Sequence, residues 1–154
     1  MTQVIVALDV DTIKREEDLL KQLKDAIVWY KVGLRLFTAH GKRAVDLVRR
    51  HGGKVFLDLK FHDIPQTVAH AVHEAQKLGV DAVSIHLMGG PDRVAAAAEG
   101  SPRPKLWGVT VLTSMTPKDV RIFHPGARVP TLVKSLAKSG WMHGADAAIV
   151  GIGA

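Results

Sequence analysis

"VFLDLKFHDIPQTV", residues 55–68, carries three charged side chains where a hydrophobic strand pattern gives way to a helix pattern. The charged residues are Asp58, Lys60 and Asp63, and Pro65 after them is typical of a first helical turn. Apolar side chains then repeat at helical spacing. The stretch therefore predicts a strand–helix unit whose strand ends in charge.

Short apolar strands alternate with helical patterns along the rest of the chain, which is typical of a parallel sheet with helical crossovers. Six strands are predicted, over residues 3–9, 27–33, 54–60, 81–87, 106–113 and 145–150. Helices are predicted between them, over about 14–26, 38–51, 65–78, 91–99 and 129–140. Residues 116–130 contain three prolines and are predicted to be the longest irregular stretch.

Five consecutive strands end in a polar residue, namely Asp9, Lys31, Lys60, His86 and Thr113. In a (β/α)₈ barrel the reactive residues lie at this edge on several strands, whereas an open doubly wound sheet binds its ligand at one switch point. The pattern favours the α/β class and the TIM barrel family. Eight units of about 26 residues need roughly 210 residues. A chain of 154 residues has room for about six, so we expect one partial, C-terminally truncated barrel domain over residues 1–154.

Composition and charge limit the classes of function and partner that the chain can have. The formal net charge of +6 favours anionic partners, such as nucleic acid or a phosphorylated small molecule. The basic residues are scattered among acids without a dense basic run, which argues against nucleic acid. The chain has no cysteine, no apolar run of about 18 residues and no signal-peptide pattern. We therefore expect a cytoplasmic protein that contacts no membrane.

The charges of the opening stretch allow two interpretations. Strand alternation places Asp58 and Lys60 on the same side as Phe56, so they can form a simple ion pair, and Asp63 can cap the following helix. Alternatively, these charges form an array with Lys31 and Asp9 at the open end of the barrel. Charges on a strand that is buried on both faces are costly and need a purpose, which favours the array.

The motif "FLDLKFHDIPQTV" resembles the D-x-K-x-x-D signature of orotidine 5′-phosphate decarboxylases, including its I-P-x-T-V tail. Further similar stretches are "VALDV" (6–10), "YKVGLRLF" (30–37), "IHLMGG" (85–90) and "VTVLTSM" (109–115). The similarity runs from residue 3 to about 115, and more weakly to about 148. The D-x-K-x-x-D core alone is shared with sugar-phosphate decarboxylases and hexulose-phosphate synthases, and the tail with "LTSM" is more specific.

The resemblance implies conversion of orotidine 5′-phosphate to uridine 5′-phosphate in de novo pyrimidine biosynthesis, without a metal or organic cofactor. It implies a charged tetrad of Lys31, Asp58, Lys60 and Asp63, with Lys60 as proton donor. It implies a homodimer with shared active sites, to which Asp63, Ile64 and Thr67 contribute across the interface. It also implies that Asp9 and Lys31 contact the ribose, and that Thr113 or Ser114 meets the pyrimidine.

The chain departs from the family pattern after its sixth strand, where it reads "VGIGA" and lacks the family's phosphate-binding loops. Binding energy from a remote phosphate helps to place the reacting end of a substrate. We therefore expect little or no decarboxylase activity from this chain alone. Two alternatives stay open: a Mg²⁺-dependent sugar-phosphate decarboxylase or hexulose-phosphate synthase of the same superfamily, and a non-catalytic remnant that binds a nucleotide or acts as an interaction module.

Overall fold

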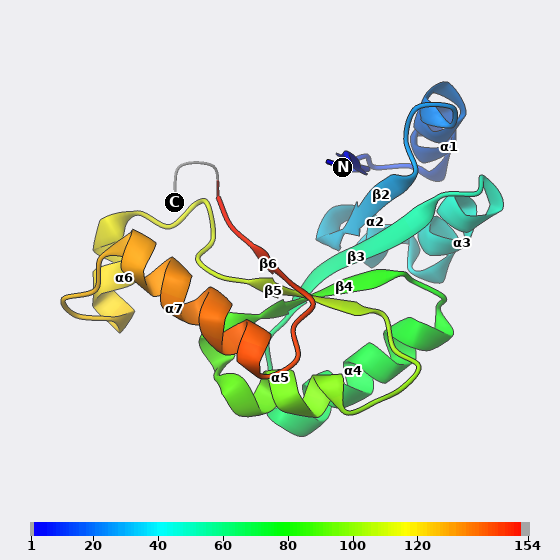
Figure 1. Ribbon diagram of the computed structural model, residues 1–154. Coiled ribbons are helices and arrows are strands. Elements are labelled where there is room, and N and C mark those ends of the chain that lie inside the picture. The colour runs from blue at the N-terminus through cyan, green and yellow to red at the C-terminus, as the bar shows by residue number, and fades with distance from the viewer. Residues whose placement is uncertain (1, 152–154) are drawn as a thin grey trace.

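The computed structural model describes residues 2–151, and its centre is one curled sheet of six parallel strands (Figure 1). Neighbouring strands follow the chain order from β1 to β6, so every connection is a crossover to the next strand. This arrangement confirms the six predicted strands. Their bounds are β1 Ile5–Ala7, β2 Trp29–Gly33, β3 Lys54–Phe61, β4 Ala82–His86, β5 Lys105–Val109 and β6 Ala147–Ile149.

Helices connect the strands and lie around the outer side of the curled sheet (Figure 1). The helix α4 shows why they form where they do: Pro65 occupies its first turn, and Val68, Val72 and Ala75 make its buried side. The helices are α1 Ile13–Leu23, α2 Leu34–His40, α3 Lys42–Arg50, α4 Pro65–Lys77, α5 Pro91–Ala98, α6 Pro117–Phe123 and α7 Val129–Met142, with a 3₁₀ turn at Leu87–Gly89.

Two predictions about the helical segments differ from the structure. The helix expected over 38–51 is two helices, because Gly41 ends α2 in a backbone conformation with φ 53° and ψ −136° that an α-helix cannot continue. The stretch 116–130 is not irregular throughout, since it contains α6. The Thr116 hydroxyl accepts the Asp119 N–H, and the Asp119 carboxylate accepts the Thr116 N–H, which forms a capping box.

The main hydrophobic core lies between the outer face of the sheet and the helices. Side chains from the strands, such as Tyr30, Leu57 and Ile85, pack there with Leu36 of α2 and Val48 of α3. Burial of this continuous apolar layer is the largest stabilising contribution to such a fold. This packing fixes the position of each strand relative to the helices, and therefore also the position of the strand's C-terminal end.

A second cluster lies on the inner face of the sheet and is mostly aromatic. Trp29, Phe56 and Trp107 lie on β2, β3 and β5, and their ring centroids are 5.3 Å apart for the two tryptophans and 4.4 Å apart for Phe56 and Trp107. This layer forms the floor beneath the charged ends of β2 and β3. Strands β1 and β6 are the two edges of the sheet.

Candidate active site

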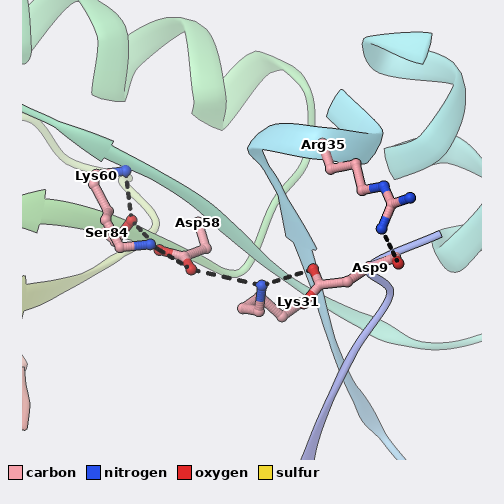
Figure 2. Close-up of polar contacts among 6 residues, drawn as sticks. All are labelled: Asp9, Lys31, Arg35, Asp58, Lys60 and Ser84. Atoms are coloured by element: carbon pink, nitrogen blue, oxygen red, sulfur yellow. Dashed lines mark hydrogen bonds and ion pairs between the residues drawn. The ribbon is translucent and has the colours of Figure 1, made fainter. Parts of the chain in front are cut away.

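Four charged residues form a continuous array along the ends of the first three strands (Figure 2). The Lys60 ammonium donates to both oxygens of Asp58, at 3.1 and 3.0 Å. The Lys31 ammonium lies 3.7 Å from Asp58 Oδ2 and donates to Asp9 Oδ1 at 3.1 Å. The structure therefore joins Asp9, Lys31, Asp58 and Lys60 with alternating sign, as the array hypothesis predicted.

Burial decreases from the centre of this array to its ends. The Asp58 side chain is 10% exposed, whereas Lys31 and Lys60 are 23% and 35% exposed. A carboxylate that is so far removed from water needs compensating partners, and here two ammonium groups and a hydroxyl provide them. The two lysines remain open to a hollow at the mouth of the sheet, which Phe56 and Thr113 also line.

Lys60 has a backbone conformation that strand alternation does not predict. Its φ is 53°, the only positive φ of a non-glycine residue within residues 2–151. The pairing of β3 with β4 is irregular between Leu57 and Phe61, so Lys60 lies in a bulge rather than in a regular strand. The same-side prediction for Asp58 and Lys60 is confirmed, but the bulge is what directs the ammonium back to Asp58.

Asp63, Ile64 and Thr67 lie at the exposed start of α4, where Asp63 and Thr67 line a second hollow beside Lys60 without bonding to the array. Within the described part of the chain, Asp63 forms no ion pair, and its Oδ1 accepts the Ile64 N–H at 2.7 Å. The interpretation of Asp63 as a helix cap is wrong, because the N-cap residue of α4 is Ile64 and no side chain caps the helix. The chain thus presents Asp63 outward.

Thr113 and Ser114 lie in a turn four and five residues after the end of β5, not at the strand end itself. The predicted strand over 106–113 is too long by four residues, since β5 ends at Val109 and Met115 N–H donates to Leu112 O in the turn. Thr113 lines the hollow beside Lys31 and Lys60, and Ser114 is exposed nearby.

A pair of stacked histidines adjoins the array. The His62 and His86 rings are 4.8 Å apart with an interplanar angle of 24°. His86 is buried, and burial followed by the positive charges of His62, Arg93 and Lys60 lowers its pKa to about 4. His86 is therefore neutral at pH 7 and serves as a packing surface at the end of β4 rather than as a charged group.

Two residues of this region were missed by the sequence reasoning. Ser84 is fully buried on β4 and contacts both Asp58 and Lys60 (Figure 2). Arg35 on α2 donates to Asp11 Oδ1 at 2.6 Å and to Asp9 O at 3.4 Å, which braces the loop after β1. A serine in an apolar strand at an inward position was the available signal for Ser84.

Residues 2–151 contain no group of three or more histidine, aspartate or glutamate side chains placed to hold a metal ion. In the same range, no helix has the length and apolarity to cross a membrane.

Comparison with known proteins shows a match over nearly the whole chain. A model of the "Orotidine 5'-phosphate decarboxylase / HUMPS family" matches residues 2–151. The orotidine 5′-phosphate decarboxylase of Pelobacter propionicus is 43% identical over 151 residues, covering 92% of this chain and 63% of that protein. That of Trichlorobacter lovleyi is 41% identical over 152 residues, with the same coverage. The chain thus spans about 63% of the length of these relatives.

Solved structures give the same picture. Orotidine 5′-phosphate decarboxylase from Lactobacillus acidophilus superimposes with a TM-score of 0.88 at 33% identity, covering 97% of this chain and 71% of that one. The Methanocaldococcus jannaschii enzyme in complex with the inhibitor BMP shows the same fold, with a TM-score of 0.80 at 23% identity and 67% of its chain covered. These structures are TIM barrels, so the predicted fold class is confirmed: the six strands form part of such a barrel.

Proposed function

Because this chain belongs to the orotidine 5′-phosphate decarboxylase / HUMPS family, we propose that it acts in the conversion of orotidine 5′-phosphate to uridine 5′-phosphate. The observation that carries the proposal is the buried Asp58 held between Lys60 and Lys31 at the mouth of the sheet. This arrangement places a fixed ammonium group beside a fixed carboxylate, which a carboxylate-bearing substrate meets as it enters the hollow.

The chemistry follows from these two charges. When the bond between C6 and the carboxyl group breaks, CO₂ leaves and the electron pair stays on C6. The Lys60 ammonium stabilises this developing negative charge and then donates a proton to C6, and the resulting amine regains its proton from solvent. Asp58 keeps the ammonium in place, and its charge repels the substrate carboxylate until CO₂ has left.

The remaining site residues are assigned roles by the resemblance. Asp9 and Lys31 bind the ribose hydroxyls, and Thr113 or Ser114 contacts the pyrimidine ring. The hydrogen bond between Asp9 and Lys31, and the position of Thr113 at the hollow, support these assignments.

A homodimer with shared active sites is part of the proposal. Asp63, Ile64 and Thr67 complete the active site of the partner copy. This assignment is supported by the position of the three residues, which are exposed at the start of α4, outside the array of their own chain. Ile64 is a large apolar residue with 64% of its surface exposed, which is the kind of side chain that a protein interface buries.

We also propose that the protein is cytoplasmic and that residues 1–154 form one partial barrel domain. A chain without cysteine suits a reducing compartment. The substrate and the product are both nucleoside monophosphates, so the proposed partner is a small molecule rather than a nucleic acid.

Binding and turnover together test the proposed function. BMP binding to the purified chain is measured by calorimetry, and loss of orotidine 5′-phosphate is followed by absorbance. We expect BMP to bind, and we expect slow turnover, well below that of a full-length relative, that disappears in Lys60→Ala. Lys54→Ala at the exposed start of the same strand is the matched control and keeps both signals.

The outcomes separate the candidate functions. Absence of both BMP binding and turnover overturns the proposal. Binding without turnover supports the nucleotide-binding alternative, and turnover that EDTA removes supports the Mg²⁺-dependent alternative. Turnover near that of a full-length relative contradicts the expectation of low activity for this chain alone.

A further inference from the structure

Ser84 connects two parts of the site that the charged array leaves separate. It lies in the middle of β4 with no exposed surface. Its hydroxyl donates to Asp58 Oδ1 at 2.8 Å, and its Oγ accepts the backbone N–H of Lys60, also at 2.8 Å (Figure 2). One small side chain therefore contacts the buried carboxylate and the backbone of the proposed proton donor.

The Lys60 backbone has a conformation that depends on support from its surroundings. A side chain other than glycine is disfavoured at φ 53°, and such conformations persist where the surroundings hold them. The ladder between β3 and β4 is irregular from Leu57 to Phe61, so the Lys60 N–H lies where regular pairing is interrupted. The Ser84 Oγ accepts it and so anchors the bulge.

The same hydroxyl also restrains the Asp58 carboxylate. Its Oδ1 accepts from Ser84 and from Lys60, while its Oδ2 faces Lys60 at 3.0 Å and Lys31 at 3.7 Å. The hydroxyl hydrogen bond fixes the rotation of the carboxylate plane. As a result, Oδ2 points to both ammonium groups at once.

We propose that Ser84 is a positioning residue of this site, which holds the Lys60 ammonium and the Asp58 carboxylate in a fixed relative position through one hydroxyl. The inference rests on the proposed decarboxylase function. The role requires a group that donates and accepts at the same point, which serine and threonine provide and alanine does not. A misplacement of a reacting group by about 1 Å is enough to slow a reaction about 100-fold.

The first test measures the kinetics of Ser84 variants of this chain. In Ser84→Ala we expect the kcat for orotidine 5′-phosphate to fall about 10- to 100-fold, while KM and the Kd for BMP change less than about threefold. Ser84→Thr keeps the donor and the acceptor and should restore most of kcat. A purely structural role predicts instead that the stability of the protein changes and that kcat per folded molecule does not.

Thr110→Val is the matched control. Thr110 is also fully buried, and its hydroxyl donates to Ile149 O at 2.8 Å without contacting the array. The Thr110→Val substitution removes one buried hydroxyl and should leave kcat within about twofold of the wild type, since no reacting group moves. Equal losses of kcat in Thr110→Val and Ser84→Ala would overturn the proposal.

A structural measurement separates this inference from the proposed function. In a crystal structure or by NMR, the Lys60 φ of Ser84→Ala should leave the positive region, and the Lys60 amide should exchange faster with solvent. If Lys60 keeps its conformation and its contact with Asp58 in that variant, the positioning role is wrong even where decarboxylation is observed. If the wild type neither binds BMP nor turns over, the decarboxylase proposal fails, and this measurement still decides whether Ser84 positions Lys60.

Discussion

At the scale of single residues, Asp58 allows two like charges, the ammonium groups of Lys31 and Lys60, to lie on either side of one carboxylate. Lys31 and Lys60 are both within 4 Å of its carboxylate, and an interaction at such distances is worth about 4 kcal/mol at an effective dielectric near 20, before desolvation. The partial exposure of the two lysines reduces that figure. Asp58 therefore offsets the repulsion between the two ammonium groups by attracting both.

Replacement of Asp58 tests this view. We expect Asp58→Asn to lower the free energy of unfolding by about 1–2 kcal/mol, because a buried neutral amide no longer compensates two ammonium groups. Urea denaturation measures the change. Asp46→Asn breaks a more exposed pair with Lys42 and should change stability by about 0.5 kcal/mol or less. Equal effects of the two substitutions would contradict the central role of Asp58.

Alternation along the strand predicts Asp58 and Lys60 on one side, although in the structure a bulge at Lys60 produces their contact, and the sequence also identifies Lys31 and Asp9 at neighbouring strands. It did not predict the left-handed backbone of Lys60 or the contact with Ser84. A bulge depends on how two strands pair, and the pairing partner of β3 lies more than 20 residues away in the chain. Local pattern carries no information about such a contact.

At the scale of elements, Gly41 separates α2 from α3. A Cβ at this position has open space, so any penalty comes from its φ of 53° alone. We expect Gly41→Ala to destabilise the protein by about 1–3 kcal/mol. Gly100 also has open space but no positive φ, and Gly100→Ala should be neutral or stabilise by about 0.4–1 kcal/mol. Thermal unfolding of both variants checks the opposite signs.

The capping box of α6 gives a second prediction at this scale. Thr116→Ala removes the hydroxyl that accepts the Asp119 N–H, and we expect it to weaken the helix by about 1 kcal/mol. Hydrogen exchange of the amides in α6 should become faster, and the exposed Thr131 serves as the control through Thr131→Ala. Unchanged exchange in α6 would mean that Val120, which is buried, holds the helix without its cap.

The elements themselves were largely predictable, but their limits were not. The prolines at 117, 125 and 130 predict an irregular segment, although Pro117 occupies a first helical turn, where proline is favoured. The predicted helix over 38–51 missed the break at Gly41, because an isolated glycine in a helical pattern is also compatible with an uninterrupted helix. Tertiary packing decides between these possibilities, as it does for Leu36 and Val45 on either side of the break.

At the scale of the whole molecule, a buried acid makes stability depend on pH. Glu16 in α1 has no exposed surface, and neither carboxylate oxygen has a hydrogen-bond partner within the described residues. Burial raises its pKa from 4.5 to about 7, and Arg50 opposes the shift only partly. The folded state therefore holds a proton on Glu16 that the unfolded chain releases at lower pH.

The sign of the pH effect follows from that difference. The contribution of protonated Glu16 is fully present below pH 4.5 and is lost as the pH rises through about 7, so this contribution should fall by about 2–3 kcal/mol across the window. His86 has the opposite effect up to about pH 6.5, because its lowered pKa keeps it neutral in the folded state. Glu16→Gln cannot ionise, so the stability difference between wild type and Glu16→Gln isolates the Glu16 contribution and should change by this amount with pH. Urea denaturation between pH 5 and 8 measures this difference, with the exposed Glu74→Gln as control. A difference that stays constant with pH would rule out the Glu16 contribution.

The barrel class was predictable because polar residues recur at the ends of successive strands, once per strand–helix unit. Asp9, Lys31 and Lys60 show the principle, since all three meet at one edge of the sheet. The burial of Glu16 was not predictable, because an acidic residue near the start of a helix is ordinarily solvated and favourable there. Its environment comes from helix packing around the curled sheet.

The aromatic layer on the inner face also gives the molecule an optical signal. The rings of Trp29 and Trp107 are 5.3 Å apart and inclined by 36°, a geometry in which their electronic transitions couple. Trp141 on α7 is 72% exposed and remains open to aqueous quenchers. Near-ultraviolet circular dichroism therefore reports on the floor of the site, while quenchable fluorescence reports on the outer surface, and the two can be followed separately without any attached label.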